Sequence, residues 1–346
     1  MGNRIGIIGA TGYTGSELVR LLLNHPQAEI ITITSESRSG ERFSDVHPQF
    51  LGLCDIKLCK VDEVDHSDLD LVFLALPHGV SMDYVKRFSD KPYRIIDLSG
   101  DFRLTSEQSY ADWYGQEHIF AEGIERAVFG LPEWFRNEIR DARLVANPGC
   151  YPTASILAIA PLVKAGIVDN RHIIIDAKSG VTGAGIKPSN TTHFANVNDN
   201  FTAYGLSTHR HTIEIQQQLD MIGQGVNDVL FTPHLLPVDR GILATAYLKP
   251  LEGTSVNQEV IDEAYHSSYQ DENFIRYRSN VPSIKDVRAT NLCDIHAHYD
   301  ERTNTIIAIA VIDNLMKGAA GQAVQNMNIM MGWEETAGLF QVPVRP

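Results

Sequence analysis

The pattern of apolar and polar positions divides the chain into two parts, which predict different arrangements of strands and helices. In the first 150 residues, short apolar or β-branched runs alternate with stretches of helical spacing. The runs predict strands at residues 4–8, 29–35, 69–76, 93–98 and 143–146. The stretches between them predict helices at 14–24 and 80–88. Strands that alternate with helices in this way are typical of a parallel, doubly wound sheet of the Rossmann type.

The second part has a different pattern. An apolar helix is predicted at 153–164, followed by alternating or β-branched runs with short connections. These runs predict strands at 172–178, 228–231, 241–249, 292–299 and 305–312. They indicate an α+β domain with a mostly antiparallel sheet. Residues 179–207 are rich in Gly, Asn and Thr and predict a long loop, and residues 317–331 predict a final helix.

Composition narrows the class of protein. The 346 residues suggest two domains, at about 150 residues per domain. The formal net charge of −14 argues against nucleic acid or an anionic membrane as the main partner. No apolar run reaches the roughly 18 residues of a membrane span, and the chain enters a strand-like run at once, so we expect no signal peptide. The four cysteines have no zinc-site spacing, which favours a reducing, cytoplasmic location.

A glycine turn lies between the first predicted strand and the first predicted helix. Gly9, Gly12 and Gly15 have the spacing G-x-x-G-x-x-G, which differs from the common G-x-G-x-x-G fingerprint. Glycines in this context allow a backbone to approach a pyrophosphate, which then lies at the helix N-terminus. The strand before and the helix after favour a dinucleotide site over a plain turn.

Polar residues at the end of the second strand bear on the choice of cofactor. Ser35, Ser37 and Arg38 favour the 2′-phosphate of NADP, because a guanidinium binds phosphate with a fork of donors. Glu36 argues for NAD, whose ribose hydroxyl an acid usually binds. His78 follows the strand at 69–76 and could line the cofactor, cap a helix or pack.

Cys150 is the strongest candidate for chemistry. It lies in Asn-Pro-Gly-Cys-Tyr-Pro-Thr, at the start of the apolar helix that runs to Lys164. Backbone N–H groups and the helix dipole stabilise a thiolate there, which makes it a better nucleophile. The alternative for a free cysteine is a small buried apolar side chain, which we accept for Cys54, Cys59 and Cys293.

A thiolate beside a nicotinamide indicates oxidation or reduction at the acyl level, through a thioester. Such chemistry needs an acid or base with a pKa near neutrality, which histidine provides. His209 or His211 could serve, and Glu214 could orient one of them. The same three side chains could instead be metal ligands. We expect no metal, because hydride transfer with a cysteine nucleophile does not need one.

Five motifs occur in one order, namely GATGYTG, DLSGDFR, NPGCYPT, KSGVTGAG and HRHTIE. With them the chain resembles the N-acetyl-γ-glutamyl-phosphate reductases of arginine biosynthesis. The resemblance implies that NADPH reduces N-acetyl-glutamyl phosphate to the semialdehyde, with Cys150 as nucleophile and His209 as acid/base. His211 and Glu214 would support them, and the substrate anions would be held by residues among Arg103, Lys178 and Arg210. It also implies a homodimer or homotetramer.

The resemblance further implies a division into domains. Residues 1–149 with 315–346 would bind NADP(H), and residues 150–314 would carry catalysis and dimerisation. Together with the glycine turn, it gives the expected cofactor-binding residues: Gly9, Thr11, Gly12, Tyr13, Thr14, Gly15, Ser35, Ser37, Arg38, Pro77, Ser179, Gly180 and Asn314.

Alternatives remain within and outside this family. Aspartate-semialdehyde and glyceraldehyde-3-phosphate dehydrogenases share the architecture but lack the Pro-Gly-Cys-Tyr-Pro context. The reductase of lysine biosynthesis, which acts on a carrier-bound aminoadipyl phosphate, is a closer alternative. A non-catalytic NADP-binding sensor is the alternative from another class, against which Cys150 and His209 argue.

Overall fold

The computed structural model describes residues 2–225 and 227–345 and divides the chain into two compact units. The first contains the N-terminal residues through Pro148 and Ala319–Phe340, and the second contains Gly149–Gly318 and the residues from Gln341 on. Gly149 and the segments 315–318 and 341–345 were expected in the first unit and belong to the second. The Asp313 carboxylate accepts the Leu315 N–H at 2.9 Å, and the Val344 N–H donates to the Arg288 carbonyl at 3.1 Å. These bonds hold both segments to the second unit.

The first unit is built on a six-stranded sheet with the order β2-β1-β3-β4-β6-β5. All of its strand pairs are parallel, which confirms the predicted doubly wound sheet. The strands are β1 (Asn3–Ile8), β2 (Ala28–Ile33), β3 (Leu71–Leu74), β4 (Arg94–Asp97), β5 (Ala127–Phe129) and β6 (Leu144–Ala146). Every residue of β3 is buried, as the continuous apolar run predicts.

The first unit also contains helices. They are α1 (Tyr13–Leu22), α2 (Phe43–Val46), α3 (Ser81–Phe88), α4 (Glu107–Tyr114), α5 (Ala121–Arg126), α6 (Pro132–Asp141) and α11 (Gly321–Met330). The apolar pattern predicted α1 and α3 but did not predict α2, α4, α5, α6 or β5. The predicted final helix is divided, because a π-helical turn at Met316–Ala320 precedes α11.

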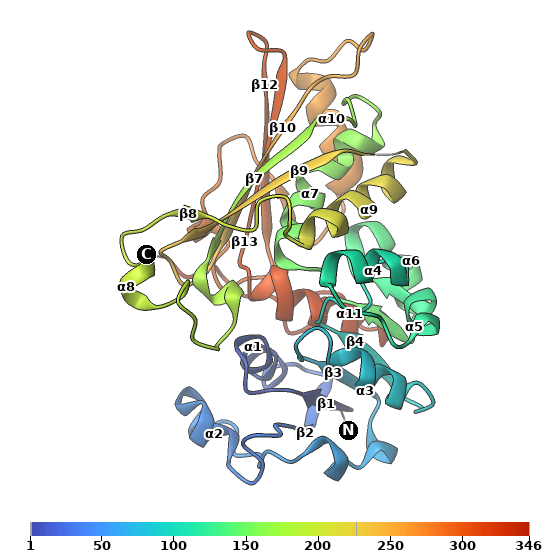
Figure 1. The fold of residues 1–346 in the computed structure, drawn as a ribbon, viewed down its shortest axis with the longest axis vertical. Helices are drawn as coiled ribbons and strands as arrows, with labels where there is room; N and C mark the ends of the chain where they lie inside the picture. The colour runs from blue at the N-terminus through green and yellow to red at the C-terminus, as the bar shows by residue number, and fades with distance from the viewer. Residues whose placement is uncertain (1, 226, 346) are drawn as a thin grey trace. The chain divides into compact units, whose positions relative to one another are not determined.

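The second unit contains a seven-stranded sheet with the order β11-β12-β13-β10-β7-β9-β8. Four of its pairs are antiparallel, and β7/β9 and β11/β12 are parallel, so the sheet is mostly antiparallel as predicted. The strands are β7 (Ile173–Gly180), β8 (Thr202–Ala203), β9 (Val229–Leu236), β10 (Ile242–Leu248), β11 (Ile275–Tyr277), β12 (Cys293–Asp300) and β13 (Thr305–Ile312). Figure 1 shows α7 (Cys150–Lys164), α9 (His211–Gly223) and α10 (Gln258–Tyr269) on one side of this sheet.

Helix α7 forms the centre of the second unit. Residues 151–163 are all buried, which explains why its sequence is apolar on every side. Pro161 lies inside the helix and has no N–H for the Leu157 carbonyl one turn earlier. The Tyr269 hydroxyl of α10 donates to that carbonyl at 2.9 Å. A side chain from a neighbouring helix therefore satisfies the acceptor that the proline leaves open.

The segment expected as one long loop, 179–207, contains short regular elements. Strand β7 continues to Gly180, a 3₁₀ turn follows at Val181–Ala184, α8 spans Phe194–Val197, and β8 pairs with β9. The expectation of an unbroken loop is therefore wrong. Composition rich in Gly and Asn identified an exposed segment but not the backbone pairing that holds it.

Candidate active site

The glycine turn joins β1 to α1. Gly9 has a φ of +86°, and a Cβ there would lie 2.7 Å from the Ala75 carbonyl oxygen. A Cβ on Gly15 would lie 2.6 Å from the Ala10 Cα, so helix and turn touch through this glycine. Gly12 is the N-cap of α1, and a Cβ there would have no heavy atom within 4 Å. The turn thus leaves open space at the helix N-terminus, and this space fits a pyrophosphate.

The predicted cofactor residues at the end of β2 differ in exposure. Ser35 is buried, whereas Ser37 and Arg38 are exposed. The Glu36 carboxylate accepts the Val61 N–H at 3.0 Å, and the Arg38 guanidinium lies 3.5 Å from the carboxylate of Glu41.

Pro77 and His78 lie in the exposed connection from β3 to α3. The His78 ring packs edge-on against Tyr114, with ring centroids 5.8 Å apart.

The DLSGDFR motif builds the loop after β4. Asp101 is fully buried and accepts the N–H groups of Gly79 and Met82 at 2.8 and 2.9 Å. Burial, with the neighbouring Asp101 charge, raises the pKa of Asp97 to about 6. Arg103 donates to the carbonyls of Leu98 and Asn147, both at 2.8 Å. The motif is thus a framework of buried carboxylates and backbone contacts, a role that its sequence did not reveal.

Cys150 is the first residue of α7, as the sequence predicted. Its N-cap, Gly149, is extended with φ −67° and ψ 154°, and α7 runs for 15 residues beyond it. The thiol side chain is partly exposed. A Cβ on Gly318 would lie only 2.8 Å from the Cys150 Cβ, so the π-helical turn at Met316–Ala320 packs directly against the cysteine. Sequence reasoning missed Gly318, although π-helical turns are frequent at functional sites.

Glu214 connects α9 to the cysteine turn. Its carboxylate is 1% exposed, and Oε1 accepts the Gly149 N–H at 2.7 Å. Oε2 lies 4.0 Å from His211 Nε2. The sequence predicted that Glu214 orients a histidine, whereas its short hydrogen bond goes to the backbone immediately before Cys150.

His209 has a defined protonation pattern. Its Nδ1 accepts the backbone N–H of His211 at 3.2 Å, which places the proton of the neutral ring on Nε2. Burial, together with the positive charge of Arg210, lowers the pKa of His209 to about 4. The ring is therefore neutral at pH 7 and offers an Nε2–H donor.

Aromatic rings surround His209. Tyr151, Tyr204 and Phe231 have ring centroids 5.8, 5.5 and 5.5 Å from it. The Tyr204 hydroxyl donates to that of Tyr151 at 3.2 Å, and burial raises the pKa of Tyr204 to about 12. Tyr151 lies inside the NPGCYPT motif. This position is the one signal in the sequence that could have identified an aromatic neighbour of His209.

Three of the predicted cofactor residues lie at or near the end of β7. The Ser179 hydroxyl donates to the Gly180 carbonyl at 3.0 Å, and a Cβ on Gly180 would lie 2.7 Å from the Asp239 carbonyl oxygen. Asn314 accepts the Gly241 N–H at 2.8 Å and donates to Thr182 Oγ1 at 2.9 Å.

Lys178 is held by its own strand. Its ammonium group lies 2.9 Å from the carboxylate of Asp176 and donates to the Asp176 carbonyl at 3.1 Å.

The structure gives no support to the alternative metal site. Within residues 2–225 and 227–345, no three His, Cys, Asp or Glu side chains converge in a way that could hold a metal ion. Nor does any helix in this part of the chain have the length and apolar character to cross a membrane.

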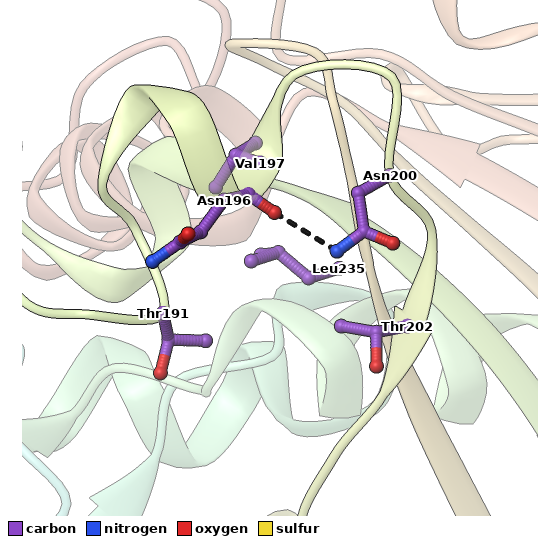
Figure 2. Close-up of a pocket in the computed structure, with 6 residues that line it drawn as sticks. All are labelled: Thr191, Asn196, Val197, Asn200, Thr202 and Leu235. Atoms are coloured by element: carbon purple, nitrogen blue, oxygen red, sulfur yellow. Dashed lines mark hydrogen bonds between the residues drawn. The ribbon is translucent and has the colours of Figure 1, made fainter.

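A small pocket lies beside α8 and β8, and one of the residues that line it, Leu235, is paired in register with Ser179 of β7. Figure 2 shows the hydrogen bond across it, from the Asn200 amide to the Asn196 carbonyl at 2.9 Å. Its volume is about 140 Å³ and it is lined by Thr191, Asn196, Val197, Asn200, Thr202 and Leu235. None of these six side chains titrates, so this pocket offers no acid or base.

Comparison with known proteins first defines the class. Residues 4–142 match the family described as semialdehyde dehydrogenase, NAD binding domain, and residues 150–314 match semialdehyde dehydrogenase, dimerisation domain. A structure of aspartate semialdehyde dehydrogenase II from Vibrio cholerae has the same fold, with a TM-score of 0.74 over 96% of this chain and 99% of that one at 16% identity. The fold is thus that of a semialdehyde dehydrogenase.

Full-length relatives define the family within that class. N-acetyl-γ-glutamyl-phosphate reductases from Methanococcus maripaludis and Methanocaldococcus jannaschii are each 47% identical to this chain, over 99% of both sequences. The enzyme of that name from Geobacillus stearothermophilus is 46% identical over the same shares. The chain belongs to the N-acetyl-γ-glutamyl-phosphate reductase family.

Proposed function

We propose that this protein reduces N-acetyl-L-glutamyl 5-phosphate to N-acetyl-L-glutamate 5-semialdehyde and phosphate in arginine biosynthesis. The reaction uses NADPH and passes through a thioester on Cys150. One observation carries the proposal: a cysteine at a helix N-terminus belongs to a chain that matches reductases of this name along its whole length. The aspartyl and aminoadipyl alternatives have no such support among these relatives.

Cys150 performs the covalent step. The N-terminus of α7 favours the thiolate, which attacks the γ-carbonyl, and phosphate leaves with the electrons of the broken C–O bond. The Glu214 carboxylate holds the Gly149 N–H at 2.7 Å and thereby fixes the turn that presents the sulfur. Bound NADPH supplies the hydride that reduces the thioester. The resulting thiohemiacetal oxyanion collapses to the aldehyde and releases the Cys150 thiolate.

His209 acts on the oxyanion. Because the ring is neutral at pH 7 and its Nδ1 already accepts a backbone N–H, Nε2–H is the group available to donate to that oxygen. Neutral imidazole donors of this kind stabilise developing negative charge in other enzymes. His211 supports the arrangement in two ways: its backbone N–H donates to His209 Nδ1, and its ring packs edge-on against the His209 ring with centroids 4.7 Å apart.

The first unit binds NADP(H). The space at Gly12 fits the pyrophosphate, and Ser35, Ser37 and Arg38 bind the 2′-phosphate. Support for NADP comes from Glu36, whose carboxylate is engaged by the Val61 N–H and so is drawn away from a ribose hydroxyl. The remaining cofactor residues are Thr11, Tyr13, Thr14 and Pro77 of this unit, and Ser179, Gly180 and Asn314 of the second.

Three cations are candidates for the substrate anions. Arg210 follows His209 directly in the chain, and its positive charge helps to lower the pKa of that imidazole, which makes it a candidate for an anionic group bound near His209. Arg103 supports the turn before Cys150 through the Asn147 carbonyl. Lys178, paired with Asp176, is the third candidate.

The second unit also mediates oligomerisation, as a homodimer or homotetramer in the cytoplasm. Support comes from one face of its sheet, where Ile174, Leu230 and Tyr247 stand side by side in register on β7, β9 and β10. They are 43%, 53% and 39% exposed. A row of exposed apolar side chains across three strands is typical of a surface that a partner covers.

The test is a spectrophotometric assay of NADPH oxidation with N-acetyl-glutamyl phosphate, aspartyl phosphate and a carrier-bound aminoadipyl phosphate. We expect turnover with the first substrate only. His209→Asn should lower kcat by about 10²- to 10⁴-fold, and His211→Asn by less. A protein that binds NADPH but oxidises it with none of the three would be a sensor, and the proposal would fail.

A further inference from the structure

A cationic pocket lies at the edge of the seven-stranded sheet formed by β11. Its volume is about 460 Å³, and it is lined by Arg276, Arg278, Lys285, Asp286, Pro343 and Arg345. These residues come from β11 and its end, from the 3₁₀ turn at Ile284–Asp286 and from the C-terminal segment. In the strand order, β12, β13 and β10 separate β11 from β7, which carries Ser179. The pocket is therefore separate from the site of Cys150 and His209.

Two buried or partly buried carboxylates hold the arginines in place. Asp294 is fully buried and receives Arg276 through Nε at 2.5 Å and Nη2 at 2.8 Å, and Arg278 through Nη1 at 2.6 Å. Asp286 receives Arg278 at 3.1 Å and Arg345 at 2.7 Å. Guanidinium groups fixed in this way lose little conformational freedom when they bind a ligand.

The charges in this pocket do not balance. Four cationic side chains meet the carboxylates of Asp286 and Asp294, which leaves an excess of two positive charges in a chain whose net charge is −14. Lys285 is exposed and, in the described part of the chain, makes no ion pair or hydrogen bond. A network that only fastened the C-terminal segment would not need this excess.

Arg276 and Arg278 also have N–H groups that are not used in these bonds. Their bonds to Asp294 and Asp286 use Nε and Nη2 of Arg276 and Nη1 of Arg278. Within residues 2–225 and 227–345, Nη1 of Arg276 and Nη2 of Arg278 make no hydrogen bond. The side chains of Arg276 and Arg278 are 41% and 26% exposed, so solvent, and hence a ligand, reaches them.

We propose that this pocket, lined by Arg276, Arg278, Lys285 and Arg345, binds a small molecule that carries a dianionic phosphate group. The oxygens of a phosphate group point in several directions, so the group can accept hydrogen bonds from cations on a strand, on a turn and on the C-terminal segment at the same time. The two negative charges of a phosphate group match the excess of two positive charges in the pocket. The volume of the pocket exceeds that of a phosphate ion, so a phosphate ester fits as well as free phosphate.

The test is isothermal titration calorimetry of the full chain with inorganic phosphate and with glycerol 3-phosphate, at constant ionic strength set with potassium chloride. The double variant K285A/R345A removes two exposed charges of the pocket. The matched control R171A/R302A removes two arginines of the same unit whose side chains are 74% and 83% exposed. Phosphate binding at the catalytic site is common to all three proteins, so their differences report on the pocket.

We expect wild type and control to bind one more phosphate per chain than the double variant, or to bind it at least about tenfold more tightly. A crystal soaked in tungstate should show anomalous density between Arg276 and Arg278. Identical isotherms for the three proteins would overturn the proposal, and so would an equal loss in variant and control. If the double variant does not fold, K285A alone provides the same comparison, because Lys285 holds no other group.

Discussion

The neutral state of His209 gives the most specific prediction of this account. Burial and the Arg210 charge lower the pKa of this imidazole from 6.5 to about 4. An ordinary histidine becomes half protonated at pH 6.5, whereas His209 should stay neutral down to pH 5. Its proton should lie on Nε2, because Nδ1 accepts the His211 N–H at 3.2 Å.

The size of the effect follows from the two pKa values of His209. They differ by about 2.5, which corresponds to at most roughly 3 kcal/mol, reduced by solvent screening because the ring is only partly buried. The folded pKa lies below the unfolded one, so on acidification the unfolded chain binds this proton first. The contribution to stability is therefore fully present above pH 6.5 and is lost as the pH falls from 6.5 towards 4.

The assay is ¹⁵N–¹H NMR of the histidine side chains between pH 5 and 8. We expect the His209 signals to show the Nε2–H tautomer and to remain unchanged across this range. Arg210→Met should raise the pKa of His209, because it removes a repulsive positive charge. Arg171→Met, at a remote and exposed position, should leave the pKa of His209 unchanged. A His209 that titrates near pH 6.5 in wild type, or carries its proton on Nδ1, would refute the reasoning.

Three further substitutions test the site. Gly318→Ala places a Cβ 2.8 Å from the Cys150 Cβ, so we expect a stability loss of about 1–3 kcal/mol in urea unfolding and a lower kcat, and an unchanged kcat would contradict the packing argument. Glu214→Ala removes the acceptor of the Gly149 N–H, which should lower kcat/KM by about 10- to 150-fold, with partial retention in Glu214→Gln; equal rates in all three proteins would count against it. Arg38→Ala should raise KM for NADPH by about 10- to 150-fold and leave kcat and KM for NADH nearly unchanged, whereas equal weakening of both cofactors would indicate that Arg38 does not bind the 2′-phosphate.

Local features of the sequence were enough to predict much of the fold. The glycine turn, the buried run of β3 and the position of Cys150 at the start of α7 were all predicted correctly. Each depends on a few adjacent residues whose backbone preferences or burial pattern are strong. The mostly antiparallel second sheet followed from runs of the same kind.

Other features depend on contacts between distant residues. Helix α11 is fully buried yet carries amides, because Gln322 and Asn326 donate to the Gly130 carbonyl at 2.7 and 2.8 Å. Glu214 binds the Gly149 N–H, and Gly318 packs against Cys150, although the partners are far apart in the sequence. No local pattern reveals such partners, since a buried polar group looks like a surface residue until its partner is known.

The thioester on Cys150 is the central claim, and mass spectrometry of the digested protein tests it most directly. Enzyme is mixed with N-acetyl-glutamyl phosphate in the absence of NADPH, quenched in acid and digested. We predict an acyl adduct on the peptide that contains Cys150, lost when NADPH is added, and neither adduct nor turnover in Cys150→Ser, which should still bind NADPH. Substantial turnover in Cys150→Ser, or an adduct on Cys54, Cys59 or Cys293 in its place, would contradict the account.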